Sequence, residues 1–215
     1  MSAHSLAAAL GGDQYLVRAK VFKLFGAAFH VYDPAGQLLL YCKLKAFKLK
    51  EDIQLFASEE QQVPLMRIAA RSVIDFSAAY DVYDLTASPS MGDASPLDTN
   101  APQGLKVGAL RRKGFSSLLK DAWEILDERD RVIGTISEEG TIKALVRRFV
   151  DAASIFMPQK FIGEIGGRPV FEMKQNFNPF VRKLQCDFNA DQGTIDRRLG
   201  MAAAILLMAI EGRQN

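Results

Sequence analysis

Hydrophobic and polar residues alternate along most of the chain with a period of two. The stretch from Leu38 to Ala46 has an apolar residue at every second position, with Lys43 and Lys45 between them. Residues 17–21 and 184–188 show the same alternation. Because successive side chains of a strand point to opposite faces, this pattern predicts antiparallel strands with one buried face and one face in water.

Segments of this kind recur through the whole chain and are separated by turn-forming sequences. We expect strands at 15–24, 28–33, 37–45, 52–57, 64–71, 78–84, 105–113, 122–127, 131–138, 160–165, 168–174 and 181–188. About twelve antiparallel strands are more than an open twisted sheet usually holds, which favours closure into a barrel. The lumen of such a barrel is too wide for side chains alone to fill. The sequence therefore predicts a mainly β fold, a β-barrel with room for a central helix.

The C-terminal segment has the composition expected of that helix. Residues Leu199–Ile210 carry no charge on any face, and a helix that is apolar all round is buried in protein or in a bilayer. At 1.5 Å per residue these residues rise ~18 Å, against ~30 Å of bilayer hydrocarbon. We therefore expect a hydrophobic helix buried in the barrel over 194–212. Arg197 and Arg198 in its first turn and Glu211 in its last oppose the helix dipole, which predicts partners for these charges at the barrel rims.

The remaining segments do not follow the β pattern. Apolar residues in 141–153 recur at helical spacing, which predicts a short amphipathic helix that either closes one end of the barrel or lies on a membrane. Residues 86–104 are rich in Ala, Ser, Pro and Asp and lack periodicity, so we expect a mobile loop insertion there. Residues 1–14 are expected to form a flexible N-terminus, and 15–212 a single barrel domain.

Composition excludes some classes of function. A formal net charge of +2 over 215 residues is too small to indicate a nucleic-acid binder, so no nucleic-acid partner is expected. The two cysteines, Cys42 and Cys186, are too few for a disulfide framework or a metal cluster. Free cysteines in strands favour an intracellular, cytoplasmic setting.

The residue types that usually carry catalysis are scarce. His4 and His30 are the only histidines, which leaves little for a hydrolytic triad or a histidine-based metal site. The glycines form no nucleotide-binding motif. We therefore expect a protein that is not an enzyme, with no cofactor and no resident metal.

One acidic turn resembles part of a calcium-binding loop. Asp187, Asn189 and Asp191 match its positions 1, 3 and 5, but Gln192 stands where the loop needs Gly and Arg198 where it needs a bidentate Glu. The favoured interpretation is a polar turn that caps the following helix at Asp191 or Thr194. A weak ion site is the alternative.

Basic residues at the ends of the predicted strands are the main functional lead. Lys43 and Lys45 share one strand face, and so do Arg111 and Lys113. Clustered cations attract anionic membrane surfaces at ~1 kcal/mol per residue, which predicts lipid binding by these four residues. The alternative is that they are solvated residues on the outside of the barrel without a ligand.

Several stretches occur in an order that resembles a known superfamily. They are Phe29–Asp33, Lys45–Lys50, Ile68–Ser72, Val107–Lys113 and Asp196–Ile205. Over residues 15 to 212 the chain resembles the tubby C-terminal-like superfamily, which includes phospholipid scramblases, and within it the LURP-one-related branch most closely. The resemblance implies a twelve-stranded barrel threaded by a hydrophobic C-terminal helix.

The resemblance also carries implications for a site. In tubby proteins a V-G-K-L-R strand holds a phosphoinositide headgroup, and Arg111 matches its arginine while Ala109 stands at its lysine position. In scramblases calcium is thought to bind just before the last helix, which keeps the ion site at Asp187–Asp191 as an alternative. Half of the tubby pair is therefore absent from this chain.

Three hypotheses about function follow. The leading one is a non-catalytic intracellular binding module of the tubby-like, LURP-one-related type that binds anionic phospholipid headgroups peripherally through its basic strand ends. The second is a scramblase-like membrane protein whose last helix inserts in the bilayer. The third is a regulatory protein that acts through protein partners.

Overall fold

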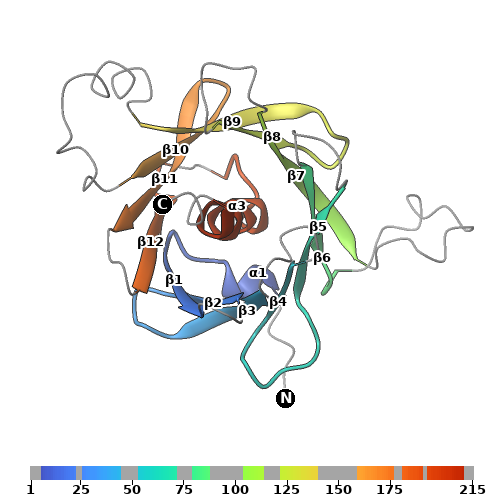
Figure 1. Cartoon of the computed structure of the whole chain (residues 1–215). Coiled ribbons are helices and arrows are strands. Elements are labelled where there is room, and N and C mark those ends of the chain that lie inside the picture. The colour runs from blue at the N-terminus through green and yellow to red at the C-terminus, as the bar shows by residue number, and fades with distance from the viewer. Residues whose placement is uncertain are drawn as a thin grey trace, which may run out of the picture.

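The protein folds as a closed antiparallel barrel with a helix inside it. The computed structural model describes residues 6–22, 26–44, 53–71, 79–87, 104–113, 122–139, 159–176, 181–190 and 193–210. Each of its twelve strands pairs with its neighbours in the chain, and the first strand closes the ring with the last (Figure 1). The predicted barrel is therefore confirmed.

The strands lie within two residues of the bounds expected from the alternation. They are β1 (Gln14–Phe22), β2 (Gly26–Tyr32), β3 (Leu38–Leu44), β4 (Ile53–Phe56), β5 (Met66–Ala70), β6 (Ala79–Asp84), β7 (Leu105–Arg112), β8 (Trp123–Leu126), β9 (Val132–Glu138), β10 (Lys160–Ile165), β11 (Arg168–Asn176) and β12 (Val181–Asp187). The agreement is close because strand geometry imposes the period-two pattern locally.

The alternation also sets the inside and the outside of the barrel. Val17 on β1 lies opposite Leu184 on β12 and Val31 on β2, and all three side chains are buried. The next residue, Arg18, is exposed. A shift of one residue would turn the whole apolar row toward water, so burial specifies the register.

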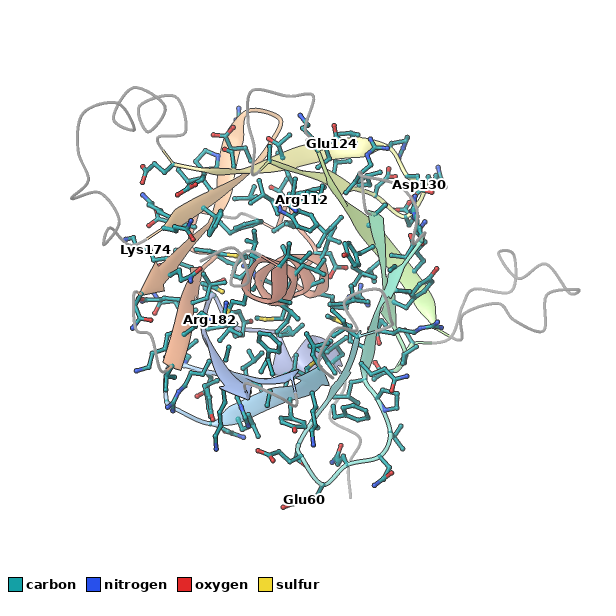
Figure 2. All side chains as sticks on the ribbon, viewed as in Figure 1. Glu60, Arg112, Glu124, Asp130, Lys174 and Arg182 are labelled. Carbon is teal, nitrogen blue, oxygen red and sulfur yellow. The ribbon has the colours of Figure 1, made fainter. Side chains whose placement is uncertain are left out.

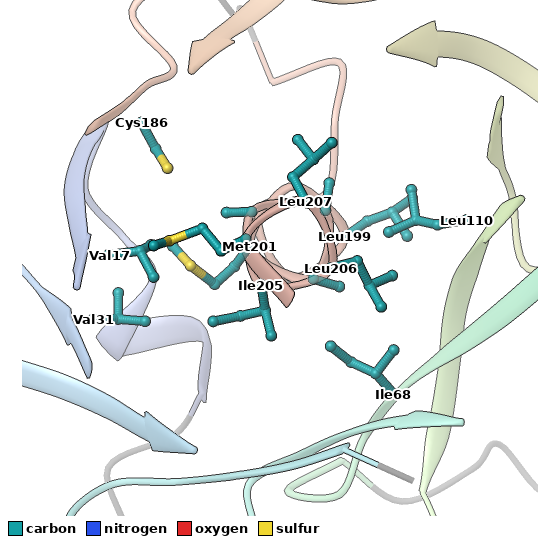
Figure 3. Close-up of a cluster of buried hydrophobic side chains, with 14 of the residues drawn as sticks. Val17, Val31, Ile68, Leu110, Cys186, Leu199, Met201, Ile205, Leu206 and Leu207 are labelled. Atoms are coloured by element: carbon teal, nitrogen blue, oxygen red, sulfur yellow. The ribbon is translucent and has the colours of Figure 1, made fainter. Parts of the chain in front are cut away.

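Helix α3 (Arg197–Ile210) occupies the centre of the barrel (Figure 1). Every residue from Leu199 to Ala209 is buried. In Figure 3 Leu199 is directed toward Leu110 on β7, and Met201 toward Val17 on β1. The predicted central helix is confirmed, although it starts at Arg197 instead of 194. Among the described residues, no helix has the length and apolar character needed to cross a membrane.

A barrel side chain meets the last turn of α3. Arg182 on β12 points into the barrel (Figure 2), and its Nη1 donates to the carbonyl oxygen of Met208 at 3.4 Å. The last carbonyls of a helix have no partner within the helix, and a cation there interacts favourably with the helix dipole. Arg182 faces inward while the next residue, Lys183, faces outward, so β12 presents a cation to each side of the wall.

A short helix shares the lumen with α3 and corrects one prediction. Helix α1 (Leu6–Ala9) precedes β1, and Leu6 and Leu10 are buried in the same core as α3. The sequence predicted a flexible N-terminus over 1–14, which does not describe residues 6–13. The physical reason is space: α3 is rich in alanine, and a close-packed interior requires further apolar side chains around it.

Some predictions lie outside the described residues. These are the amphipathic helix at 141–153, the partners of Glu211, and the loop at 86–104 apart from Thr86, Ala87 and Gly104.

Candidate functional site

The closed ring separates the two pairs of basic residues that the sequence singled out. Lys43 lies on β3 and Arg111 on β7, with β4, β5 and β6 between them. Lys113 directly follows β7. Lys45 lies outside the described residues. Lys43 therefore does not meet Arg111 and Lys113 in one patch, and the two sides of the barrel are considered one at a time.

On the β7 side, a carboxylate from the next strand neutralises the cations. Arg111 lies directly opposite Glu124 on β8; its Nε donates to Oε2 at 2.7 Å, and its Nη2 is 2.5 Å from the same oxygen. Lys113 Nζ is 3.7 Å from the other oxygen of Glu124. A surface ion pair of this kind contributes ~0–1 kcal/mol to stability. Its more important effect is that two guanidinium nitrogens already hold a carboxylate and are not directed at a ligand.

On the opposite side of the ring, the outer surface of β12, β1, β2 and β3 carries further cations. We call this surface the basic face; its cations are Arg18 and Lys20 on β1, Lys43 on β3 and Lys183 on β12. Arg18 lies directly opposite Lys183. In the next outward row, Lys20 lies opposite Ala28, and Ala28 lies opposite Lys43. Two like charges that face each other across strands destabilise a sheet, so the Arg18–Lys183 pair is an unusual feature.

Contacts around this pair leave its charge uncompensated. Within the ranges that the structure describes, no carboxylate pairs with Arg18, Lys43 or Lys183. The Arg18 guanidinium carbon lies 5.9 Å from the centroid of the Tyr32 ring. The backbone N–H of Lys183 donates to Asn176 Oδ1 at 3.1 Å, which holds the strand but does not involve the ammonium group.

Aromatic side chains lie beside these cations on the same outer surface. His30 on β2 lies opposite Arg18 on one side and Tyr41 on the other. Its ring stacks on Tyr32 with centroids 6.1 Å apart, and it lies 5.1 Å from the Tyr41 ring. Such rings present an apolar body and a polar tip, which suits the boundary between water and a lipid layer.

A carboxylate borders this aromatic group. His30 Nε2 lies 2.8 Å from Glu59 Oε1, in the turn between β4 and β5. Burial raises the pKa of Tyr41, and the charge of Glu59 adds to this effect. The Tyr41 hydroxyl is therefore neutral at pH 7 and remains able to donate a hydrogen bond.

The start of α3 forms a second polar cluster. Arg198 Nη1 lies 2.6 Å from Asp84 Oδ2 on β6, and Arg197 Nη2 lies 2.7 Å from Asp13 Oδ1 just before β1. Burial by itself would raise the pKa of Asp84, but hydrogen bonds from Thr86 and Arg198 outweigh it and hold that pKa below its ordinary value. The predicted pairing of these two arginines with the barrel rim is confirmed. Because every charge here has a protein partner, this cluster anchors the helix.

The helix cap differs from the prediction. The backbone N–H of Arg198 donates to Asp196 Oδ1 at 2.9 Å, so the capping residue is Asp196 and not Asp191 or Thr194. The helix starts later than expected because Asp196 occupies the N-cap position, from which its side chain reaches the backbone N–H of the second helical residue.

Among the described residues, the acidic turn and the cysteines show no reactive arrangement. Asp187 Oδ1 accepts from the backbone N–H of Asn189 at 2.8 Å, while Asp191 lies outside the described residues. In the described part of the chain, no group of His, Cys, Asp and Glu could hold a metal ion. Cys42 and Cys186 are both buried, and burial raises the pKa of the Cys42 thiol to about 12.

Sequence analysis named Lys43 but not Arg18 and Lys183, which the structure places on the same outer surface. Both lie on the polar side of alternating stretches near opposite ends of the chain. The only signal that could have joined them is closure of the ring, which pairs the first strand with the last. Nothing in the local pattern of either stretch indicates that pairing.

Comparison with known proteins identifies no family. No protein-family model matches the chain and no curated protein matches its sequence. Among solved structures, the chain is similar to an X-ray structure of a protein from Arabidopsis thaliana, AT5G01750, at 12% identity with a TM-score of 0.44, over 94% of this chain and 92% of that one. A likeness at this level carries no functional information. Membership of the tubby C-terminal-like superfamily stays a prediction.

Proposed function

We propose that this protein is a non-catalytic binding module that attaches peripherally to anionic phospholipid surfaces through its basic face. The observation that carries the proposal is the Arg18–Lys183 pair, two like charges held opposite each other on the outer wall. The pair costs the fold stability. An anionic partner would offset that cost.

The expected affinity follows from the number of cations. A lysine or arginine close to an anionic leaflet contributes ~1 kcal/mol. Arg18, Lys43 and Lys183, which have no carboxylate partner among the described residues, together support ~3 kcal/mol of attraction. Tyr32 and Tyr41 add amphipathic rings at the same surface. Binding of this strength is reversible and sensitive to salt. Since anionic lipid is concentrated in the cytoplasmic leaflet, we propose that side of the membrane as the site of action.

The proposal changes the set of residues expected from the sequence. It keeps Lys43 and adds Arg18, Lys20 and Lys183. It leaves out Arg111 and Lys113 because Glu124 already pairs with both of them. Lys45 stays a prediction from the sequence.

Vesicle sedimentation tests the proposal. The protein should sediment with phosphatidylcholine vesicles that contain phosphatidylserine and remain in the supernatant with phosphatidylcholine alone. Arg18→Glu removes two units of charge from the contact, so its partition coefficient should fall roughly 30-fold. Raising the salt concentration should weaken wild-type binding.

The matched control is Arg129→Glu. Arg129 lies in the turn between β8 and β9, its side chain is 75% exposed, and the turn is across the ring from β1. The change in net charge is identical, but vesicle binding should be unaffected. An equal loss in both variants, or equal binding of the wild type to neutral vesicles, would contradict a role for the basic face.

The two alternatives from the sequence make different demands. A scramblase-like function requires α3 to leave the barrel, where Leu199 to Ala209 are buried and Arg198 is paired with buried Asp84. No observation among the described residues favours such a movement. A regulatory protein that acts through protein partners would be favoured if the folded wild type bound neither kind of vesicle.

A further inference from the structure

The like-charge pair at the centre of the basic face has a defined geometry. Arg18 and Lys183 are directly opposite residues of paired antiparallel strands, so their Cβ atoms lie about 4.5–5.5 Å apart. The closed sheet prevents either strand from moving away from the other. Two flexible cationic side chains therefore start from neighbouring positions on the wall. The Arg18 guanidinium carbon lies 5.9 Å from the Tyr32 ring centroid, so it has to turn from there toward a ligand that also contacts Lys183.

Headgroups differ in how well they match two adjacent positive charges. A carboxylate or a phosphodiester carries one negative charge. It therefore neutralises only one of the two cations, and the pair with its ligand keeps a net positive charge. A phosphomonoester carries a charge of about −1.5 to −2 at neutral pH and has three strong acceptor oxygens. Arginine binds such a group through a planar fork and lysine as a point charge. One phosphomonoester therefore satisfies both side chains at once.

We infer that the basic face binds a phosphomonoester group between Arg18 and Lys183, in preference to headgroups with a single charge. The inference rests on the proposed function, since it names the class of headgroup that the same face takes. The chemistry is shared by a phosphomonoester lipid and by a free phosphomonoester, and the experiment below separates these sources.

Glu59 contacts His30, the neighbour of Arg18 on β2, and lowers the affinity expected for an anion at this site. Its carboxylate is held 2.8 Å from His30 Nε2, and His30 is the residue opposite Arg18 on β2. A negative charge in that place repels an incoming dianion. Glu59→Gln keeps a hydrogen-bonding side chain beside His30 while removing the charge, so it should strengthen phosphomonoester binding.

The experiment compares vesicles of equal surface charge that contain either phosphatidic acid, a phosphomonoester, or phosphatidylserine. The wild type should bind the phosphatidic acid vesicles about fivefold more tightly, because one additional cation of the protein contacts a negative charge of the lipid. Glycerol 3-phosphate, the same headgroup without the lipid, should raise the Tm of the wild type because a ligand of the native state stabilises it.

Lys183→Glu is the decisive variant because it separates binding from stability. It converts the like-charge pair into an opposite-charge pair across the strands, which should raise the Tm of the ligand-free protein. It should also abolish both the preference for phosphatidic acid and the Tm shift with glycerol 3-phosphate. A lysine with only a structural role predicts a lower Tm. Arg129→Glu, the matched control, should change none of these readouts.

The outcomes distinguish this inference from the proposed function. Equal binding to both anionic vesicles, without a Tm shift, overturns the phosphomonoester site and leaves membrane binding standing. Suppose that glycerol 3-phosphate raises the Tm of the wild type but not of Lys183→Glu, and that the wild type binds no vesicle. This result supports a site for a free phosphomonoester and overturns membrane binding. Failure of Glu59→Gln to strengthen phosphomonoester binding places the ligand elsewhere and overturns the inference.

Discussion

Arg111 on β7 and Arg18 on β1 hold equivalent places in the barrel wall, yet their surroundings are opposite. Both point outward from alternating strands, and each is followed two residues later by a lysine, Lys113 and Lys20. The residue facing Arg111 on the next strand is Glu124, and the residue facing Arg18 is Lys183. The same spacing of basic residues therefore lies beside a carboxylate in one place and, among the described residues, beside another cation in the other. The neighbouring strand decides which.

Both surfaces depend on an intact barrel, and the largest expected effect tests that dependence. Leu206→Asp places an unpaired charge on the buried helix, where Leu206 has 0% exposure. We expect the free energy of unfolding to fall by more than about 4 kcal/mol, measured by urea denaturation. The control Val63→Asp changes a residue that is 72% exposed and should have little effect. A Leu206→Asp protein with normal stability that fails only to bind vesicles would indicate a membrane anchor instead of a core helix.

A charge exchange between the two surfaces should reverse their roles. The double variant Lys183→Glu with Glu124→Lys keeps the formal net charge of +2, since the changes of −2 and +2 cancel. It supplies Arg18 with a carboxylate and removes the one beside Arg111. In this background Arg111→Gln should weaken vesicle binding about fivefold, and Arg18→Gln should have no effect. Continued dependence on Arg18 would show that the cross-strand neighbour does not control binding.

The two single changes of that exchange should act on stability with opposite signs. Lys183→Glu replaces a repulsive cross-strand pair with an attractive one and should raise the free energy of unfolding by about 0.2–1 kcal/mol. Glu124→Lys does the reverse at Arg111 and should lower it by a similar amount. Urea denaturation with an unchanged slope measures both effects. Destabilisation by both variants would mean that Lys183 has a packing role that the register does not reveal.

The smallest expected effect distinguishes two lysines with the same change of charge. Lys113→Gln removes a cation that lies near Glu124, so vesicle binding should be unchanged and stability should change by less than about 0.5 kcal/mol. Lys43→Gln removes an exposed cation of the basic face and should weaken vesicle binding about fivefold. Equal effects of the two variants would mean that net charge, not its position, governs attraction to the membrane.

The fold was readable from the sequence to within a few residues because its determinants are local. Apolar residues at every second position, as from Leu38 to Leu44, follow directly from strand geometry. The absence of charge in Leu199–Ile210 required a buried environment, whatever surrounded it. Errors occurred where local pattern and packing diverge. Leu6 and Leu10 belong to a segment too short to show periodicity, and their burial depends on the space left beside α3.

The basic face was only partly predictable from the sequence. Lys43 was identified because a lysine on the polar side of a strand is visible in the sequence, and Arg111 was identified for the same reason. The sequence does not indicate Glu124 as the partner of Arg111, because strand register is a property of the pair and not of either strand. Charges within a strand can be read in order, but their neighbours on the next strand cannot.

What the sequence alone determined is therefore which side chains face the core and which face water, including a helix with no face suited to solvent. What only the tertiary structure decided is which outward charges meet: Arg111 with Glu124, Arg198 with Asp84, and Arg18 with Lys183. The physical reason is range. Alternation is imposed within each strand by backbone geometry, whereas closure of the barrel brings together residues from opposite ends of the chain.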